Sequence, residues 1–198
     1  MNRKTLAVKL SKLEKFENVK ANLEQYATDS ETAASLLWIA FMNGDIEGKV
    51  VADFGCGNGI LGIGALMLGA KKVYFVDVDK EAINLAKKNN SFDGASFENL
   101  DISKFNKKVE SVVMNPPFGV QEEHADRVFL EKATAISNNI YSIHKIESKN
   151  FIRSFMKDAG FEIERVEEIK LILGKTMKFH KKEKYVVEVG IWVLKRKL

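Results

Sequence analysis

The chain has 198 residues, of which 45% are hydrophobic and 29% charged. This composition is typical of one folded domain and excludes a disordered segment. A single cysteine, Cys56, excludes an intramolecular disulfide, and three widely spaced histidines form no metal-ligand pattern, so we expect no bound metal. The longest apolar run, Leu36 to Met42, is too short to cross a bilayer, and the lysine-rich N-terminus is not a signal peptide. We therefore expect a cytoplasmic protein with no membrane contact.

Positive charge is concentrated near the end of the chain. The net charge is only +4, but residues 170–198 hold nine lysines and arginines against two glutamates. Local positive charge attracts phosphate groups, so this segment suits a polyanion such as RNA. A solvated basic face is the alternative, and composition alone leaves both open.

Hydrophobic periodicity predicts two helices first, over residues 5–16 and 32–42, with Asp29 or Ser30 as N-cap of the second. From Lys49 onward, short apolar runs alternate with amphipathic segments. The expected strands cover residues 50–54, 72–77, 95–99, 109–114, 140–143, 161–173 and 184–194. The expected helices cover residues 60–68, 126–136 and 148–159, and one more helix is capped by Asp79. The pattern predicts an α/β fold whose parallel sheet is covered on both faces and closes with an antiparallel edge.

A glycine-rich motif, Asp53-Phe-Gly-Cys-Gly-Asn-Gly59, follows the first strand. Glycines allow a sharp turn and let a ligand approach the backbone. The next strand ends in Asp77, whose carboxylate can accept hydrogen bonds from both hydroxyls of a ribose. Ligands of open α/β sheets bind at the carboxyl ends of the strands. The two features predict a cofactor that contains a nucleoside.

The spacing of the glycines favours one type of cofactor. A dinucleotide fingerprint requires a sixth-position glycine, where this chain has Ile60. The Asp53 carboxylate would repel a pyrophosphate but suits the cationic amino acid part of S-adenosylmethionine. We therefore favour the methyl donor over a dinucleotide, with a glycine turn that binds nothing as the remaining alternative.

A second motif, Asn115-Pro-Pro-Phe118, ends the expected strand at residues 109–114. The prolines remove two backbone donors and fix two φ angles, which leaves carbonyl acceptors on a rigid path. With the Asn115 side-chain carbonyl, they can accept both N–H groups of an amine, while Phe118 stacks on a planar ring. The alternative is a proline turn that closes the strand, with Phe118 in the core.

Together, the two motifs resemble those of class I S-adenosylmethionine-dependent amino-methyltransferases. Segments 23–28 (Leu-Glu-Gln-Tyr-Ala-Thr), 141–145 (Tyr-Ser-Ile-His-Lys) and 178–182 (Lys-Phe-His-Lys-Lys) are similar to the methyltransferase-like protein five family, and the chain resembles an archaeal-type relative. The resemblance implies a Rossmann-like fold with a seven-stranded, mostly parallel sheet, an antiparallel C-terminal edge strand and helices on both faces. It also implies methyl transfer to the exocyclic N6 amine of an adenine in structured RNA, namely small-subunit ribosomal RNA.

The resemblance further implies a single domain over residues 1–198. Residues 1–45 would form a helical cap and cofactor lid, and residues 46–198 a catalytic core with a basic C-terminal hairpin. A small zinc-ribbon activator protein is an expected partner besides RNA.

Individual roles follow from the same resemblance. The cofactor would be held by Gln25, Tyr26, Thr28, Asp53, Gly55, Gly57, Asp77, Asp101 and Asn115. The target amine and base would be held by Asn115, Pro116, Pro117 and Phe118. RNA would contact His144, Lys145, Lys178, Phe179, His180, Lys181 and Lys182.

Several of these residues have a structural alternative. Asp101 suits the cap of a turn as well as an adenine amine, and for Asp79 we favour a helix cap over a cofactor contact. His144 and Lys145 could simply be polar residues at a strand end, and His180 an exposed histidine.

Three rival functions share part of the pattern. A glutamine methyltransferase that modifies protein release factors carries the same glycine loop and an N-P-P turn. A catalytically silent cofactor-binding subunit or RNA chaperone, and a dehydrogenase, are the other two. The complete N-P-P-F motif argues against a silent subunit, and the missing sixth-position glycine argues against a dehydrogenase.

Overall fold

The computed structural model describes residues 1–16, 28–117, 125–174 and 184–197. Its centre is a seven-stranded sheet in the order β3-β2-β1-β4-β5-β7-β6. The strands are β1 (Val50–Phe54), β2 (Lys72–Asp77), β3 (Ala95–Asn99), β4 (Ser111–Met114), β5 (Asn139–Lys145), β6 (Phe161–Gly174) and β7 (Lys184–Arg196). Strands β1 to β5 pair in parallel, whereas β7 pairs antiparallel with both β5 and β6. The predicted α/β fold with an antiparallel C-terminal edge is confirmed.

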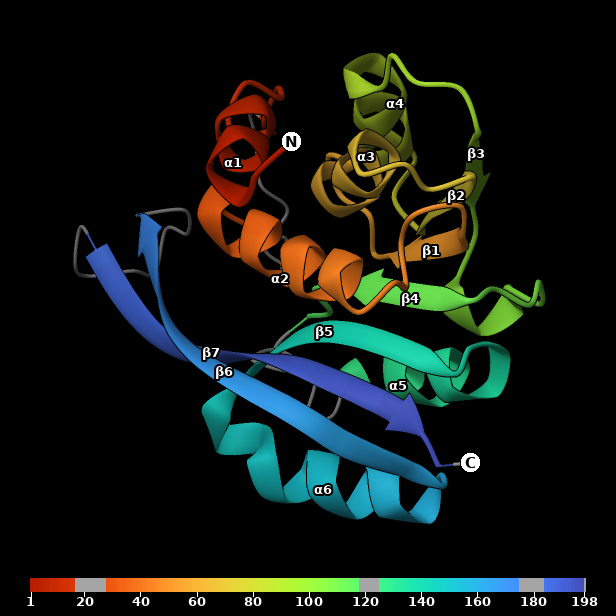
Figure 1. The fold of residues 1–198 in the computed structure, drawn as a ribbon, viewed down its shortest axis with the longest axis vertical. Helices are drawn as coiled ribbons and strands as arrows, with labels where there is room; N and C mark the ends of the chain where they lie inside the picture. Colours follow the sequence, from red (N-terminus) through yellow and green to blue (C-terminus); the bar gives the residue numbers. More distant parts are fainter. Residues whose placement is uncertain (17–27, 118–124, 175–183, 198) are drawn as a thin grey trace.

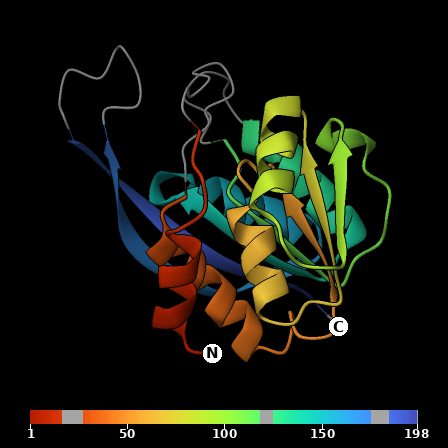
Figure 2. The same ribbon diagram turned by 90° about the horizontal axis from the view of Figure 1, so that it is seen from above.

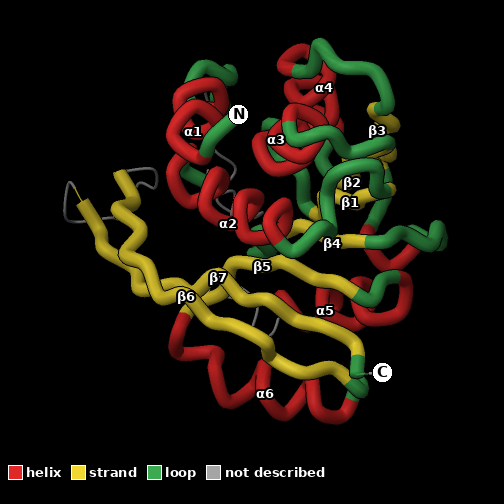
Figure 3. Tube along the Cα trace, viewed as in Figure 1, coloured by secondary structure: helices red, strands yellow, loops and turns green. Residues whose placement is uncertain are grey.

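Helices cover both faces of this sheet (Figures 1 and 3). They are α1 (Arg3–Leu10), α2 (Ser30–Met42), α3 (Ile60–Met67), α4 (Lys80–Asn89), α5 (Ala125–Ile136) and α6 (Lys149–Asp158), with 3₁₀ turns η2 (Ile102–Lys104) and η3 (Ile146–Ser148). Helices α1 to α4 lie on one face, and α5 and α6 lie on the other (Figure 1). No helix in the described ranges is long and apolar enough to cross a membrane.

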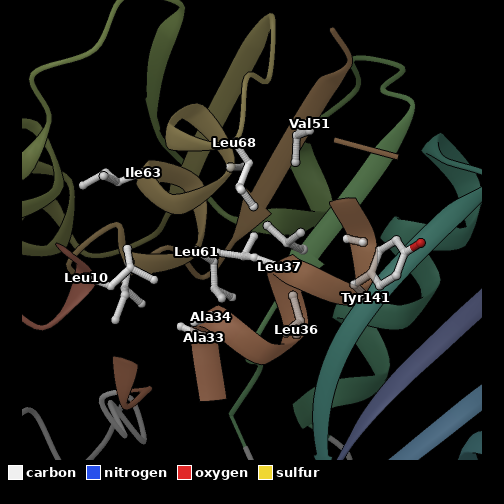
Figure 4. Close-up of a cluster of buried hydrophobic side chains, with 14 of the residues drawn as sticks. Leu10, Ala33, Ala34, Leu36, Leu37, Val51, Leu61, Ile63, Leu68 and Tyr141 are labelled. Carbon is white, nitrogen blue, oxygen red and sulfur yellow. The ribbon is translucent and has the colours of Figure 1, made fainter. Parts of the chain in front are cut away.

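Two hydrophobic clusters hold these layers together. The first lies under α1 to α4, where Leu10, Leu37 and Ile63 meet Val51 and Tyr141 of the sheet (Figure 4). The second lies under α5 and α6 and includes Phe54, Leu130 and Trp192. Burying one large apolar side chain contributes about 1.5–3 kcal/mol, so both faces stabilise the sheet.

Polar side chains set where two helices begin. Asp29 Oδ1 accepts the backbone N–H groups of Glu31 and Thr32 at 3.0 Å each, so Asp29 rather than Ser30 caps α2. Asp79 caps α4 by accepting the N–H of Glu81 at 3.0 Å, which confirms the favoured alternative. These bonds satisfy donors that the first helical turn leaves unpaired.

The first helix ends earlier than its periodicity predicts, at Leu10 instead of Phe16. The chain beyond it is tied to the loops of the core, because the backbone of Glu14 bonds to the side chains of Asn58 and Asn89 at 2.9–3.1 Å. Asn58 belongs to the glycine motif and Asn89 is the last residue of α4. Tertiary hydrogen bonds therefore override the local helical pattern and bring the N-terminal segment to the glycine loop.

The carboxyl ends of the parallel strands share one edge of the sheet. Figure 2 shows β1 and β3 pointing to this edge, while both chain ends lie on the opposite side. Strands β2, β1 and β4 are neighbours, so the segments that follow them meet there.

At Gly62, helix α3 packs closely against Phe75 of the sheet. A Cβ at residue 62 would lie 2.3 Å from Cε1 of Phe75, a fully buried ring stacked on Phe97. We predict that Gly62→Ala lowers the free energy of unfolding by roughly 1–3 kcal/mol, because overpacking outweighs the gain of about 1 kcal/mol in helix propensity. Urea denaturation measures this change.

Asn84→Ala is the matched control, since Asn84 is exposed in the interior of α4. It should change the stability by no more than about 0.5 kcal/mol. An unchanged stability of Gly62→Ala would contradict the packing described for α3.

Candidate active site

The glycine loop leaves β1 in an unusual backbone conformation. Gly55, Gly57 and Gly59 have φ angles of 66°, 54° and 85°, a region that other residues rarely adopt. The loop is held at the sheet edge because the N–H groups of Gly55 and Cys56 donate to the Val76 carbonyl at 2.9 and 3.1 Å. Among the described residues, a Cβ on Gly57 would approach Phe16 alone, at 3.8 Å. The described part of the chain therefore leaves room for a ligand beside the backbone of Gly57.

Asp77, at the end of β2, is oriented by backbone donors. Its Oδ1 accepts the N–H of Asp79, and its Oδ2 accepts the N–H of Gly57, both at 2.9 Å. Burial raises the pKa of this carboxyl group. Each carboxylate oxygen retains a second lone pair. The half-buried group is thus fixed beside the glycine loop and can still accept the two hydroxyls of a ribose.

Asp53, near the end of β1, is deeply buried. Its side chain is only 1% exposed, and Oδ2 accepts the N–H of Gly62 at 2.8 Å. Burial raises the pKa of Asp53 to about 7. The carboxylate thus secures the first turn of α3 from within the core, and its expected contact with the methionine part of a cofactor stays a prediction.

Asp101 lies after β3 and has the geometry of a turn cap. Its Oδ1 accepts both the N–H and the hydroxyl of Ser103, at 2.8 and 2.5 Å. The hydroxyl bond is the main reason why the pKa of Asp101 is lowered. The capping alternative is thus realised, while the exposed second oxygen leaves a contact with a cofactor's adenine open.

Asn115 follows β4 and its amide is held in one orientation. Nδ2 donates to Thr28 Oγ1 at 2.9 Å. Oδ1 is buried and has no hydrogen-bond partner among the described residues. Nδ2 uses one of its two N–H groups in this bond, and the unpaired Oδ1 offers an acceptor to a substrate. Leaving a buried acceptor unpaired costs about 1–3 kcal/mol, so a hydrogen bond from a substrate N–H to Oδ1 would be favourable.

The other expected site residues fall into three groups. Pro116 is buried and Pro117 half-buried directly after Asn115. Lys145 is half-buried at the end of β5, whereas His144 is 1% exposed. The expected contact of His144 with RNA stays a prediction, and the deep burial of this side chain gives it a contact inside the fold as well. Gln25, Tyr26, Phe118, Lys178, Phe179, His180, Lys181 and Lys182 lie outside the described residues.

The geometry fits S-adenosylmethionine. Gly57 offers open backbone, Asp77 offers two oriented acceptors, and both lie at the carboxyl ends of adjacent strands. Asn115 follows the strand on the other side of β1, so an acceptor for an amine lies at the same edge as the cofactor residues. Fold and site define a class I S-adenosylmethionine-dependent methyltransferase.

Comparisons with known proteins agree with this class. The family model of ribosomal protein L11 methyltransferase (PrmA) matches residues 27–168. The rRNA N(6)-adenosine-methyltransferase METTL5 of Danio rerio is 32% identical over 201 residues, which cover 96% of each chain. The chain belongs to the PrmA-type methyltransferases and, within them, to the METTL5 family. The family predicted from the motifs is thus confirmed, and the rival interpretation as a dehydrogenase is excluded.

Solved structures of other methyltransferases are similar to this chain over its whole length. The crystal structure of Pyrococcus horikoshii PH1948, described as a candidate RNA methyltransferase, has 44% sequence identity and a TM-score of 0.94, and the match covers 100% of this chain and 99% of that one. The magnesium protoporphyrin IX methyltransferase of Synechocystis, solved with S-adenosylmethionine bound, has 17% identity and a TM-score of 0.65 over 100% and 98% of the chains, and shares the fold. The protein is a methyltransferase whose cofactor is S-adenosylmethionine.

Sequence reasoning missed two contacts of the site. Thr28 was expected at the cofactor but bonds to Asn115, and Asp126 was expected only as the start of a helix but contacts His144. Neither pair has a sequence signal, since the partners are 87 and 18 residues apart and belong to different elements. Only the fold brings them together.

The buried Asp53 predicts a pH-dependent stability. Its carboxyl group keeps its proton up to about pH 7 in the folded protein, against an ordinary value of 3.8. The unfolded chain releases this proton at lower pH, so folding loses stability as the pH rises from about 4 to 7. We predict that Asp53→Asn, whose amide oxygen can still accept from Gly62, removes this loss, which is on the order of a few kcal/mol.

Denaturation of both proteins between pH 4 and 8 measures the effect. The stability of the wild type relative to Asp53→Asn should fall up to about pH 7 and then level off. Asp93→Asn is the control, because Asp93 is exposed and should give a difference that changes little with pH. A constant difference for Asp53→Asn would show that Asp53 is ionised throughout.

Proposed function

We propose that the protein methylates the exocyclic N6 amine of an adenine in structured RNA, in particular in small-subunit ribosomal RNA. The observation that carries the proposal is the amide of Asn115, whose Oδ1 has no hydrogen-bond partner within the described ranges and which follows β4 at the sheet edge of the cofactor residues. Family membership supports it, since the METTL5 relative is named as an rRNA N(6)-adenosine-methyltransferase. The choice of the small subunit comes from the sequence resemblance alone.

The exocyclic amine of adenine is a weak nucleophile, so the enzyme must make its nitrogen more reactive. The lone pair of the adenine amine is delocalised into the ring. S-adenosylmethionine supplies an electrophilic methyl group. Acceptance of one N–H by Asn115 Oδ1 and of the other by the Pro116 carbonyl would favour a pyramidal nitrogen with a freer lone pair. The same acceptors stabilise positive charge that develops on the nitrogen, and their fixed positions align it for transfer.

The substrate must present an unstacked base. A paired adenine would have to leave its helix, whereas a loop adenine is already accessible. We propose that Phe118 stacks on this base, and that Lys178, Lys181 and Lys182 bind phosphates, with Phe179 and His180 available for further stacking. Lys145 would add a cation at the carboxyl edge of the sheet.

The cap and lid arrangement is also a proposal. Thr28 precedes α2 and touches Asn115, while Phe16 lies beside Gly57. The N-terminal region thus contacts the N-P-P-F motif through Thr28 and lies beside the glycine motif at Phe16. We propose that residues 1–45 act as the cap, with Gln25 and Tyr26 over the cofactor, and that the enzyme works in the cytoplasm, where its RNA is found.

Removal of the Asn115 acceptor tests the proposal. We predict that Asn115→Ala lowers kcat for methylation of ribosomal RNA by at least about 100-fold, because a preorganised acceptor contributes roughly 2.7–4 kcal/mol to the transition state. Affinity for S-adenosylhomocysteine should change by less than about threefold, since Asp77 and the glycine loop are untouched. Transfer of labelled methyl groups and calorimetry measure the two effects.

Asn90→Ala serves as the control, because the Asn90 side chain bonds to Phe92 in a loop outside the site. Near-normal turnover of Asn115→Ala would contradict the mechanism. The same assay with a release factor tests the rival glutamine methyltransferase: label in the protein and none in RNA would replace the proposed substrate, and label in neither would favour a silent subunit.

A zinc-ribbon activator is proposed as a partner. Strand β3 is an edge of the described sheet, pairs only with β2 there, and is half-buried over most of its length. An unpaired strand edge is a template for pairing with another chain. We propose that the activator docks along β3.

A binding partner stabilises the folded state by mass action. We predict that the small zinc-ribbon protein from the same genome, added at about 100 times its Kd, raises the stability by about 2.7 kcal/mol. Thermal unfolding with the intact partner and with a zinc-stripped sample measures this. An identical Tm in both mixtures and in the protein alone would exclude the partner.

A further inference from the structure

Asp126 and His144 form a buried pair next to the site. Nδ1 of His144 lies 3.2 Å from Oδ2 of Asp126. His144 is 1% exposed and Asp126 is 7% exposed. Asp126 is in the first turn of α5 and His144 is near the end of β5, so the contact joins this helix to the sheet.

The contact with the carboxylate favours one tautomer of the His144 imidazole. A carboxylate can only accept, so it favours the proton on Nδ1. In a neutral ring, Nε2 is then an acceptor. Nε2 of His144 is buried without a hydrogen-bond partner in the described part of the chain. The Trp192 ring packs edge-on against the imidazole, with centroids 6.5 Å apart. Of the two ring nitrogens, Nδ1 is thus the one with a protein partner.

Helix α5 connects this pair to the glycine loop. One turn after Asp126, the ring of Phe129 covers Gly55, since a Cβ at residue 55 would lie 3.1 Å from its Cε1. The start of α5 therefore packs against the cofactor loop.

Strand β5, which carries His144, is the direct neighbour of the strand that leads into the N-P-P-F motif. Met114, the last residue of β4, pairs with Ser142, two residues before His144. A displacement of β5 relative to α5 would therefore be felt at the segment that holds the target amine.

We propose that Asp126 and His144 act as positioning residues for methyl transfer, through the contact of Nδ1 with the carboxylate. The pair fixes the first turn of α5 against β5 and thereby fixes the segment after β4 and the loop at Gly55. Neither residue touches the reacting atoms. For the choice of substrate, the inference rests on the proposed function.

Two isosteric variants separate the ring nitrogens. The amide nitrogen of His144→Asn can occupy the place of Nδ1, whereas His144→Gln extends to the place of Nε2 and loses the contact with Asp126. We predict that His144→Asn retains kcat within about threefold. His144→Gln and Asp126→Ala should lower kcat by about 10- to 100-fold, with a smaller change in KM for RNA. Thermal unfolding shows whether each variant is folded.

A double variant tests the coupling. Asp126→Ala with His144→Gln should lose no more activity than either single variant, because both remove the same contact. Additive losses would overturn the proposal. So would activity in His144→Gln with loss in His144→Asn, or equal effects of these two variants. If the wild type methylates a release factor and no RNA, the proposed function fails, and the same comparison is made on that protein substrate.

Discussion

The hydrogen bond from Asn115 Nδ2 to Thr28 Oγ1 determines what the site can do. An amide offers a donor and an acceptor, and in a free side chain either end could face a substrate. The bond to Thr28 anchors the amide through one of its two N–H groups, and Oδ1 is the acceptor that an amine requires. The anchor is a residue outside the core strands, so the N-terminal region contributes to the orientation of Asn115.

The parallel sheet supplies the second constraint. Carboxyl ends of neighbouring parallel strands meet at one edge, so Asp77, the glycine loop and Asn115 come together although they are separated in sequence. Polar or glycine residues lie at the end of β2 and directly after β1 and β4, and the N–H of Gly57 in the loop after β1 donates to Asp77 at the end of β2. Cofactor and amine sites are therefore built on one rigid frame.

Most of the architecture could be predicted from the sequence. Alternating apolar runs predicted the strands because buried parallel strands must be apolar throughout, and the predicted caps included Asp29 and Asp79. The motif residues Asp77 and Asn115 lie at the expected edge for the same reason. What periodicity could not predict was the early end of α1, because the chain after it bonds to Asn58 in the glycine motif and to Asn89 at the end of α4, both distant in sequence.

The roles of individual polar residues were less predictable. Asp53 and His144 look like ligands in the sequence, because charged or ionisable groups at strand ends commonly face a site. The structure buries both and pairs each with a group in a helix, Gly62 in α3 and Asp126 in α5. Burial depends on how helices pack over a strand end, which residue type and spacing do not reveal.

The placement of the chain ends has a practical consequence. Both lie across the sheet from the edge that holds the glycine loop and Asn115 (Figure 2). A purification tag, fluorophore or surface linker attached at either end would therefore project away from this edge. Immobilised protein should keep the edge turned toward solution, which makes surface-based measurements of binding to the proposed RNA substrate feasible from either terminus.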